Sequence, residues 1–190
     1  MSTVEDFLSS VRYQINDTGA VEYSNDELIE YLNIAIRFLS SELIGISSHL
    51  LLKETTIALT DNMGDLPSDF IKEKAVLDAD GYTLYSAPPS ATLSQIIYKI
   101  IGDKIYSKAS SPLTLYYFYF YPSVSAITDT LPTKDYMEDL LKEMVIFLAL
   151  NRNEYNLSTE GQLLANFKDK VLSLANFGKQ NLDRQLPFVI

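Results

Sequence analysis

The chain contains no cysteine among its 190 residues, and it has one histidine, His49. The lack of cysteine excludes disulfide bonds, thiolate metal ligands and a cysteine nucleophile. A conventional zinc site needs several cysteine or histidine ligands, so His49 alone cannot form one. We therefore expect His49 to be an ordinary surface or packing residue, and we expect no bound metal or cofactor.

Motifs for nucleotide binding and for covalent catalysis are also missing. The seven glycines build neither a G-x-G-x-x-G nor a G-x-x-x-x-G-K-[ST] pattern, and no serine lies in a G-x-S-x-G sequence. Asp78-Ala79-Asp80-Gly81 matches only the start of a calcium loop, so a hairpin turn is the better interpretation. We predict no catalytic residue and no enzymatic activity. A hydrolase that uses paired carboxylates stays open as an alternative, although the sequence nominates no such pair.

Basic residues are scarce relative to acidic ones. Lys and Arg number 15 against 25 Asp and Glu, which gives a formal net charge of -10. This balance argues against direct nucleic-acid binding and against docking on anionic membranes. The longest apolar run, residues 144–150, is far shorter than the ~20 residues of a membrane-spanning helix. The first residues are acidic and amphipathic, unlike a signal peptide. We expect the protein to be made and kept in solution.

Two helices are predicted in the first 50 residues. Apolar residues recur at helical spacing over residues 4–15 and again over residues 25–44. Ser24 followed by Glu27 forms a capping box, which indicates where the second helix begins. The two helices should pack together as a helical hairpin.

Strand-like patterns follow in residues 51–122. Residues 53–60 are rich in β-branched side chains and predict a strand, and residues 61–65 have the composition of a loop. Residues 74–85 read as a hairpin. A second hairpin covers residues 96–106, with glycine first in its two-residue turn, as a type II′ turn prefers.

The last expected strand, residues 113–121, is unusually aromatic. Its centre, residues 116–121, contains only tyrosine and phenylalanine, so alternation places aromatic rings on both faces. An exposed edge with this composition would promote aggregation. We predict a central strand that is covered on both sides, although tyrosine-rich faces also suit contact with another subunit.

Two further helices are predicted near the end of the sequence. Thr133 is expected to cap the first, and residues 144–150 are apolar all round, which predicts burial on every side. Ser158 is expected to cap the second, with Gly178 as its C-cap. Residues 183–190 are expected to form an extended tail. Its apolar end either folds onto its own domain or binds a partner.

The order of these elements predicts an α+β fold, because the strands do not alternate with the helices. The expected parts are an N-terminal helical hairpin, a central antiparallel sheet or set of hairpins, a long C-terminal helix pair and an extended tail. We expect one domain over residues 1–182, helical in 1–50, β-rich in 51–122 and helical in 132–178, followed by the tail of residues 183–190.

Four fragments in this order resemble the podovirus-type phage head-to-tail adaptor family, also called connector or tail tubular protein A-like proteins. Val11–Asp17 followed by Tyr23–Ala35 is similar to that family's N-terminal helix pair, which carries "Leu-x-x-x-Leu-Asn-x-Ala". Leu66–Ile71 is similar to the Pro-x-Asp-Phe segment with which the family's chain enters its sheet. Phe120-Tyr121-Pro122 before a long helix, and Leu148–Asn151 near the join of the last two helices, fit the same plan.

The resemblance implies a structural virion protein at the head-tail junction. Such a protein forms a ring of about twelve subunits below the portal, continues the DNA channel and provides the tail attachment site. The implied partners are the portal protein, a tail or nozzle protein and further copies of the chain. The resemblance is compatible with a monomer before assembly. DNA passes through the lumen without specific binding, no membrane is involved, and the host cytoplasm is the place of assembly.

The last residues are the expected partner-contact site, because an extended segment with an apolar end can become ordered on contact. These residues are Arg184, Gln185, Leu186, Pro187, Phe188, Val189 and Ile190. Two alternatives to the adaptor remain: a tail-associated peptidoglycan hydrolase and a generic soluble interaction domain with an acidic face.

Overall fold

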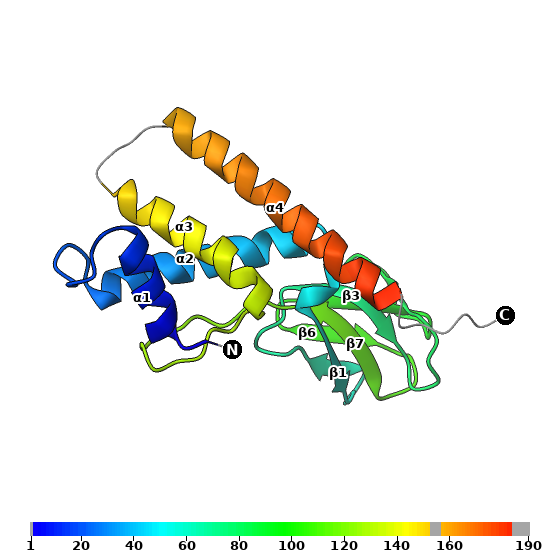
Figure 1. Ribbon diagram of the computed structural model, residues 1–190. Coiled ribbons are helices and arrows are strands. Elements are labelled where there is room, and N and C mark those ends of the chain that lie inside the picture. Colours follow the sequence, from blue (N-terminus) through cyan, green and yellow to red (C-terminus); the bar gives the residue numbers. More distant parts are fainter. Residues whose placement is uncertain (1, 153–156, 184–190) are drawn as a thin grey trace. The chain divides into compact units, whose positions relative to one another are not determined.

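Four α-helices and two β-sheets are present in the described part of the chain (Figure 1), so the prediction of an α+β fold is confirmed. This computed structural model describes residues 2–152 and 157–183, without the side chains of residues 157–160, 162–163 and 177–183. The chain divides into two compact units. Residues 1–50 and 121–190 form the helical unit, and residues 51–120 form the strand unit.

The helical unit begins with α1 (Val4–Gln14) and α2 (Asn25–Gly45), close to the predicted bounds. The side chain of Ser24 accepts a hydrogen bond from the Glu27 amide at 3.1 Å, which confirms the predicted cap. Burial of the apolar stripe of α2 stabilises the helix, since each fully buried aliphatic side chain contributes about 1.5–3 kcal/mol. The members of this stripe, each at most 1% exposed, are Leu28, Leu32, Ala35, Ile36, Leu39 and Leu43.

The next helix of this unit, α3 (Glu138–Leu150), begins later than predicted, because the 3-10 turn η2 (Asp135–Met137) precedes it. Thr133 was expected to be the cap, and this prediction is wrong. Its side chain is buried and its hydroxyl has no hydrogen-bond partner among the described residues. The acidic side chains of Glu138 and Asp139 lie in the first turn of α3 instead, where the helix dipole favours negative charge.

The last helix, α4 (Leu157–Asp183), continues beyond Gly178, so the predicted C-cap at that glycine is wrong. A glycine inside a helix costs only about 1 kcal/mol relative to alanine, which the remaining contacts of a long helix can offset. Phe167 and Val171 of α4 are buried, and the Phe167 ring meets Phe38 of α2 edge-on at 5.3 Å between centroids. The helix therefore packs on α2 through its middle.

The strand unit contains two sheets. The first has the order β1 (Leu52–Ile57), β7 (Leu113–Phe118), β3 (Lys72–Leu77), with antiparallel pairing throughout. The second has the order β2 (Met63–Asp65), β6 (Lys104–Ser107), β5 (Ile97–Ile101), β4 (Tyr85–Ser86), in which β4 runs parallel to β5. The short 3-10 turn η1 (His49–Leu51) precedes β1 in the sequence. One apolar cluster holds buried residues from both sheets, among them Val76, Ile105 and Leu115.

The turns account for the successes and errors in the strand predictions. The hairpin over residues 96–106 is confirmed: Ile101 pairs with Lys104, and Gly102 has a φ of +62° as the first residue of the turn. The hairpin predicted over residues 74–85 is present only at its turn. Leu77 and Thr83 form one bridge, after which the chain leaves β3 and forms β4 beside β5.

Residues 61–65 were expected to be a loop, but they form a tight turn and the strand β2. Asp61 and Asn62 both have positive φ, +53° and +67°, and Thr60 and Met63 exchange two backbone hydrogen bonds across them. This is the pattern of a two-residue type I′ turn. The polar composition therefore marked the turn correctly but concealed the strand that follows it.

The aromatic strand β7 lies between β1 and β3, so its predicted central position is confirmed. It ends at Phe118, before the predicted residue 121. On one face Leu115 and Tyr117 are buried, and on the other face Phe118 is buried while Thr114 and Tyr116 are half-buried. The predicted cover is therefore found on one face of β7 and only in part on the other.

Candidate functional site

The residues that the sequence nominated for partner contact, Arg184 to Ile190, lie outside the described residues. The described part of α4 ends at Asp183, immediately before them. The candidate site is therefore built from the surfaces of the helical unit that the structure does describe.

The turn between α1 and α2 is organised by one carboxylate, that of Asp17. Its oxygens accept hydrogen bonds from the backbone amides of Val21 at 2.8 Å, Glu22 at 3.0 Å and Tyr23 at 3.2 Å. Arg12 of α1 donates to the same carboxylate at 2.5 Å, with its other nitrogen 2.8 Å from Asn25. The backbone hydrogen bonds, that of Glu22 first, hold the pKa of Asp17 below its ordinary value. These four hydrogen bonds to Asp17 hold the turn between α1 and α2.

A second arginine ties this turn to the end of α3. Arg152 donates to the Glu22 carbonyl oxygen at 3.1 Å, forms an ion pair with Glu27 at 3.1 Å, and lies over the Tyr23 ring. The Tyr23 hydroxyl donates to the Ala149 carbonyl oxygen at 2.9 Å. The start of α2 and the end of α3 are thereby joined within the helical unit.

Asn33, in the "Leu-Asn-x-Ala" sequence of α2, holds the segment that follows residue 120. Its side-chain amide donates to the Val124 carbonyl oxygen at 2.9 Å, and its oxygen accepts from the Val124 amide at 2.9 Å. Asparagine is well suited to this role because its side chain carries both a donor and an acceptor. Ala35 of the same sequence is fully buried.

In the strand unit, the Pro-x-Asp-Phe fragment lies where the chain enters β3. Asp69 accepts hydrogen bonds from Lys53 at 2.6 Å and from the Tyr117 hydroxyl at 2.9 Å, and Phe70 packs against the Tyr117 ring. The hydrogen bond from Lys53 is the largest cause that lowers the pKa of Asp69. Burial raises the pKa of Tyr117 to about 12.

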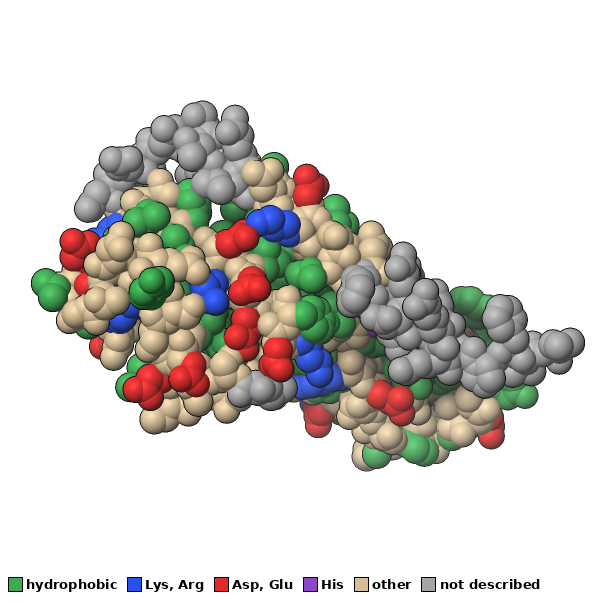
Figure 2. Space-filling view, in the orientation of Figure 1, with side chains coloured by type: hydrophobic (Ala, Val, Ile, Leu, Met, Phe, Trp, Pro, Cys, Tyr) green, Lys and Arg blue, Asp and Glu red, His purple; other side chains and the backbone are tan. Residues whose placement is uncertain are grey.

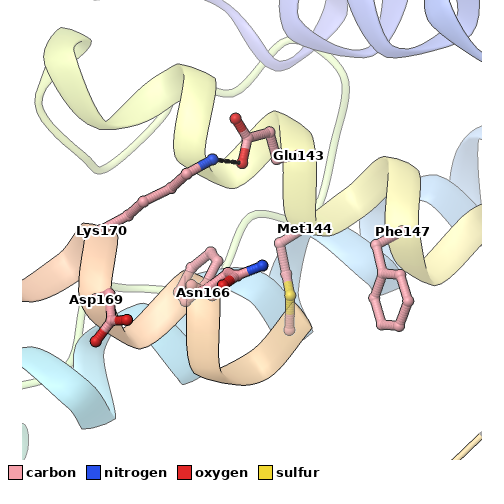
Figure 3. Close-up of a pocket in the computed structure, with 7 residues that line it drawn as sticks. Glu143, Met144, Phe147, Asn166, Asp169 and Lys170 are labelled. Atoms are coloured by element: carbon pink, nitrogen blue, oxygen red, sulfur yellow. Dashed lines mark hydrogen bonds and ion pairs between the residues drawn. The ribbon is translucent and has the colours of Figure 1, made fainter. Parts of the chain in front are cut away.

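A cavity of about 340 Å³ lies between α3 and α4, and Figure 3 shows it closely. Met144 and Phe147 of α3 and Phe167 of α4 provide its apolar lining. Phe167 is buried and Phe147 is half-buried. We call this cavity the α3–α4 groove. Its size is at the lower end for ligand pockets, and a thioether with two aromatic rings suits apolar side chains.

Charged residues surround the apolar lining of the α3–α4 groove. Lys170 of α4 reaches across and forms an ion pair with Glu143 of α3 (Figure 3). Both side chains are more than half exposed, so the pair adds little to stability. Asp169 and Asn166 line the same rim from α4. The rim therefore offers acidic, basic and amide groups around an apolar floor.

A wider hollow, of about 690 Å³, follows one face of α2. Its lining alternates charged residues such as Asp26, Glu30 and Arg37 with the apolar residues Ile34 and Phe38. The hollow combines charged and apolar residues as the α3–α4 groove does, but all of its lining residues come from one helix and it is the more open of the two. The α3–α4 groove is the better-defined binding surface of the two.

The α3–α4 groove was not predicted from the sequence, because residues 144–150 were expected to be buried on every side. That prediction is wrong: Ile146, Phe147 and Leu148 are half-buried, and Leu150 is 59% exposed. The sequence did contain a signal for this groove. Residues 144–150 of α3 are apolar on all sides of the helix, and α1, α2 and α4 cover only part of that apolar surface.

Negative charge is concentrated in the helical unit. This unit has 17 acidic and nine basic residues, whereas the strand unit has eight and six. Figure 2 shows a row of acidic side chains down the middle of the face in view. Exposed Asp135, Asp139 and Glu143 follow one another at intervals of four residues along η2 and α3. No helix in the described part of the chain is long and apolar enough to cross a membrane.

A metal-binding cluster does not occur among the described residues. No group of three or more His, Asp or Glu side chains there is arranged to hold a metal ion. His49 is exposed in η1. The Asp78 side chain accepts from the backbone amides of Asp80 at 3.0 Å and Tyr82 at 2.8 Å, and Gly81 has a φ of +85°. The interpretation of this sequence as a hairpin turn is confirmed.

Comparison with known proteins adds no relative: no protein-family model matches the chain, and none of the curated proteins is significantly similar to it.

Proposed function

We propose that the chain is a structural protein of a phage virion, a head-to-tail adaptor that forms a ring below the portal. In this role it continues the DNA channel, provides the site at which the tail attaches, and binds the portal protein, a tail or nozzle protein and further copies of itself. It acts by assembling and performs no chemical reaction.

The observation that carries the proposal is the structural role of the adaptor-like fragments. Arg12 and Asp17 fix the turn between α1 and α2, and Asn33 holds the segment that leads to α3. Asp69 lies where the chain enters β3, and it binds Lys53 and Tyr117. In each of these fragments a polar side chain holds a turn or a connecting segment in place. The fragments thus support a shared fold plan, from which the function is inferred.

The charge of the helical unit supports the same proposal. Its excess of acidic over basic residues, 17 against nine, produces a field that repels phosphate groups. Duplex DNA binds proteins mainly through cationic contacts to its backbone. A ring of acidic subunits would therefore let DNA pass without adhering to the wall.

Mixing the chain with its cognate portal protein tests the proposal. We expect a stable complex in which copies of the chain form a ring, measured by size exclusion with light scattering and by electron microscopy. The portal alone and the chain alone serve as controls. If no ring is retained on the portal, the adaptor proposal is wrong, whereas a monomer in the free state does not count against it.

An activity assay separates the adaptor from the hydrolase alternative. We expect no muramidase activity in the purified chain. Activity that disappears when a single Asp or Glu is substituted would overturn the structural proposal and would locate the catalytic carboxylate.

A further inference from the structure

The α3–α4 groove has the size and the chemistry to hold a short apolar peptide. Its volume of about 340 Å³ accommodates a few side chains and no folded domain. Figure 3 shows the Met144 side chain of α3 directed toward α4, while Lys170 reaches from α4 to Glu143. The floor offers sulfur and aromatic contacts, and the rim supplies the acidic groups of Glu143 and Asp169.

The sequence of this chain contains a matching segment. Leu186-Pro187-Phe188-Val189-Ile190 is a run of five apolar residues, and Arg184 precedes it by two positions. An aromatic side chain flanked by aliphatic ones complements the Met144, Phe147 and Phe167 lining, since sulfur–aromatic and aromatic–aromatic contacts are favourable. The Arg184 guanidinium complements the Asp169 carboxylate on the rim, because Glu143 already pairs with Lys170.

The length of α4 prevents this segment from filling the groove of its own chain. Phe167 precedes Asp183 by 16 residues, which span about 24 Å of helix, and Lys170 precedes it by 13 residues, or about 20 Å. Phe188 follows Asp183 by five residues, which reach at most about 18 Å when fully extended. Ile190 follows Asp183 by seven residues, which reach at most about 25 Å, but about four of these residues are needed to turn the chain back along α4. The residues that remain after the turn span only about 11 Å, so the segment falls short of even the nearer end of the groove.

We infer that the segment Leu186–Ile190 of one copy binds in the α3–α4 groove of a neighbouring copy, with Phe188 against Phe147 and Phe167. The inference rests on the proposed adaptor function and names the contact that joins its subunits. Such a contact is heterologous, because a different surface of each copy takes part, and repetition around an axis closes it into a ring.

Paired cysteine variants test the contact directly, because the natural chain has no cysteine. Full-length Phe147→Cys is mixed with a tagged full-length Phe188→Cys, free at high concentration and again in the presence of portal, under mild oxidation. A disulfide forms only when the two Cβ atoms come within about 4.5 Å. We expect a cross-linked heterodimer on non-reducing gels. We also expect the double variant to give a ladder of multimers, without an intramolecular product.

Leu172→Cys is the matched control, since Leu172 is 42% exposed on α4 and does not line the groove. We expect at least a tenfold higher yield for the pair 147 and 188 than for the pair 172 and 188. Lys170→Cys with Phe188→Cys provides a second groove pair if Phe147→Cys fails to fold, as judged by circular dichroism.

The outcomes separate this inference from the proposed function. Equal yields for groove and control pairs, or an intramolecular disulfide in the double variant, would overturn the docking contact. A ring that forms on the portal without the groove cross-link also overturns it while the adaptor function stands. A groove cross-link without any portal complex supports the contact between copies and rejects the adaptor function.

Discussion

The Arg12 guanidinium lies 2.5 Å from the Asp17 carboxylate, and both side chains are more than 90% buried. Asp17 also accepts three backbone hydrogen bonds in the turn that joins α1 to α2. We predict that Asp17→Asn destabilises the protein, because the amide removes the negative charge that Arg12 requires and places a donor among donors. The measurement is the midpoint of urea unfolding, which we expect to fall.

Glu22→Gln is the control for this substitution. It also removes one acidic charge from the turn, but the Glu22 side chain is exposed and only its backbone takes part in the hydrogen bonds to Asp17 and Arg152. We expect its urea midpoint to match that of the natural chain. Equal losses in the two variants would show that net charge, and not the buried network, determines the stability of the turn.

The same carboxylate predicts how stability depends on pH. The pKa of Asp17 is lowered by backbone hydrogen bonds, and those of Asp69 and Asp129 are lowered too. A lowered native pKa means that the stabilisation is present above the unfolded pKa of about 4 and is lost as the pH falls through the native value. The difference in urea midpoint between the natural chain and Asp17→Asn should therefore be largest near about pH 7 and shrink toward about pH 3. A constant difference would contradict this assignment.

In the strand unit, Tyr117 gives a prediction at the other end of the pH scale. Burial raises its pKa to about 12, and its hydroxyl donates to Asp69 at 2.9 Å. The raised pKa means that stabilisation is complete below the unfolded value of about 10 and is lost as the pH rises toward the native value. Tyr117→Phe should remove about 1 kcal/mol of unfolding free energy at neutral pH and make unfolding less sensitive to alkaline pH. Chemical unfolding at neutral and alkaline pH measures both effects.

Tyr116→Phe is the matched control for Tyr117, because it changes the neighbouring residue on the opposite face of β7. Tyr116 is half-buried, and its pKa is raised mainly by a hydrogen bond with Glu54. We expect a smaller loss of stability than for Tyr117→Phe. A larger loss of stability for Tyr116→Phe than for Tyr117→Phe would show that the main stabilising contacts of β7 lie on the face of Tyr116.

The helices were predictable because their signals are local. The capping box at Ser24 and the apolar stripe of α2 both act within a few residues, and both are found in the structure. The errors arise where tertiary packing overrides a local signal. Gly178 resembles a C-cap, yet α4 continues to Asp183, and Thr133 resembles an N-cap, yet it is buried beside a 3-10 turn.

The sheets were less predictable, because strand pairing depends on residues that are distant in the sequence. The pattern around residues 74–85 specifies a turn, but it cannot specify that β4 pairs parallel to β5 and not along β3. The α3–α4 groove was missed for a related reason. An apolar circumference on α3 predicts contact on every side, and only the positions of α2 and α4 determine which side remains open.

Two phenylalanines of the α3–α4 groove should differ in their contribution to stability. Phe167 is 5% exposed and meets Phe38 edge-on, so Phe167→Ala leaves a cavity and should cost about 3 kcal/mol or more. Phe147 is half-buried, and Phe147→Ala should cost about 1 kcal/mol. Chemical unfolding of both variants measures the difference. A large loss for Phe147→Ala would mean that this side chain belongs to the core and is not available for docking.

Gly64 of β2 should not tolerate a side chain. A Cβ atom at this position would clash with the Ile57 side chain and lie 3.0 Å from the Ala58 carbonyl oxygen, a backbone atom that cannot move without shifting the strand. Gly64→Ala should therefore cost about 1–3 kcal/mol of unfolding free energy through overpacking.

Gly45→Ala provides the control, since no atom lies within 4 Å of the added Cβ and the position is the last residue of α2. There alanine should stabilise by about 0.5–1 kcal/mol. Thermal unfolding of the two variants should thus move in opposite directions, and a neutral Gly64→Ala would show that β2 does not pack closely against Ile57.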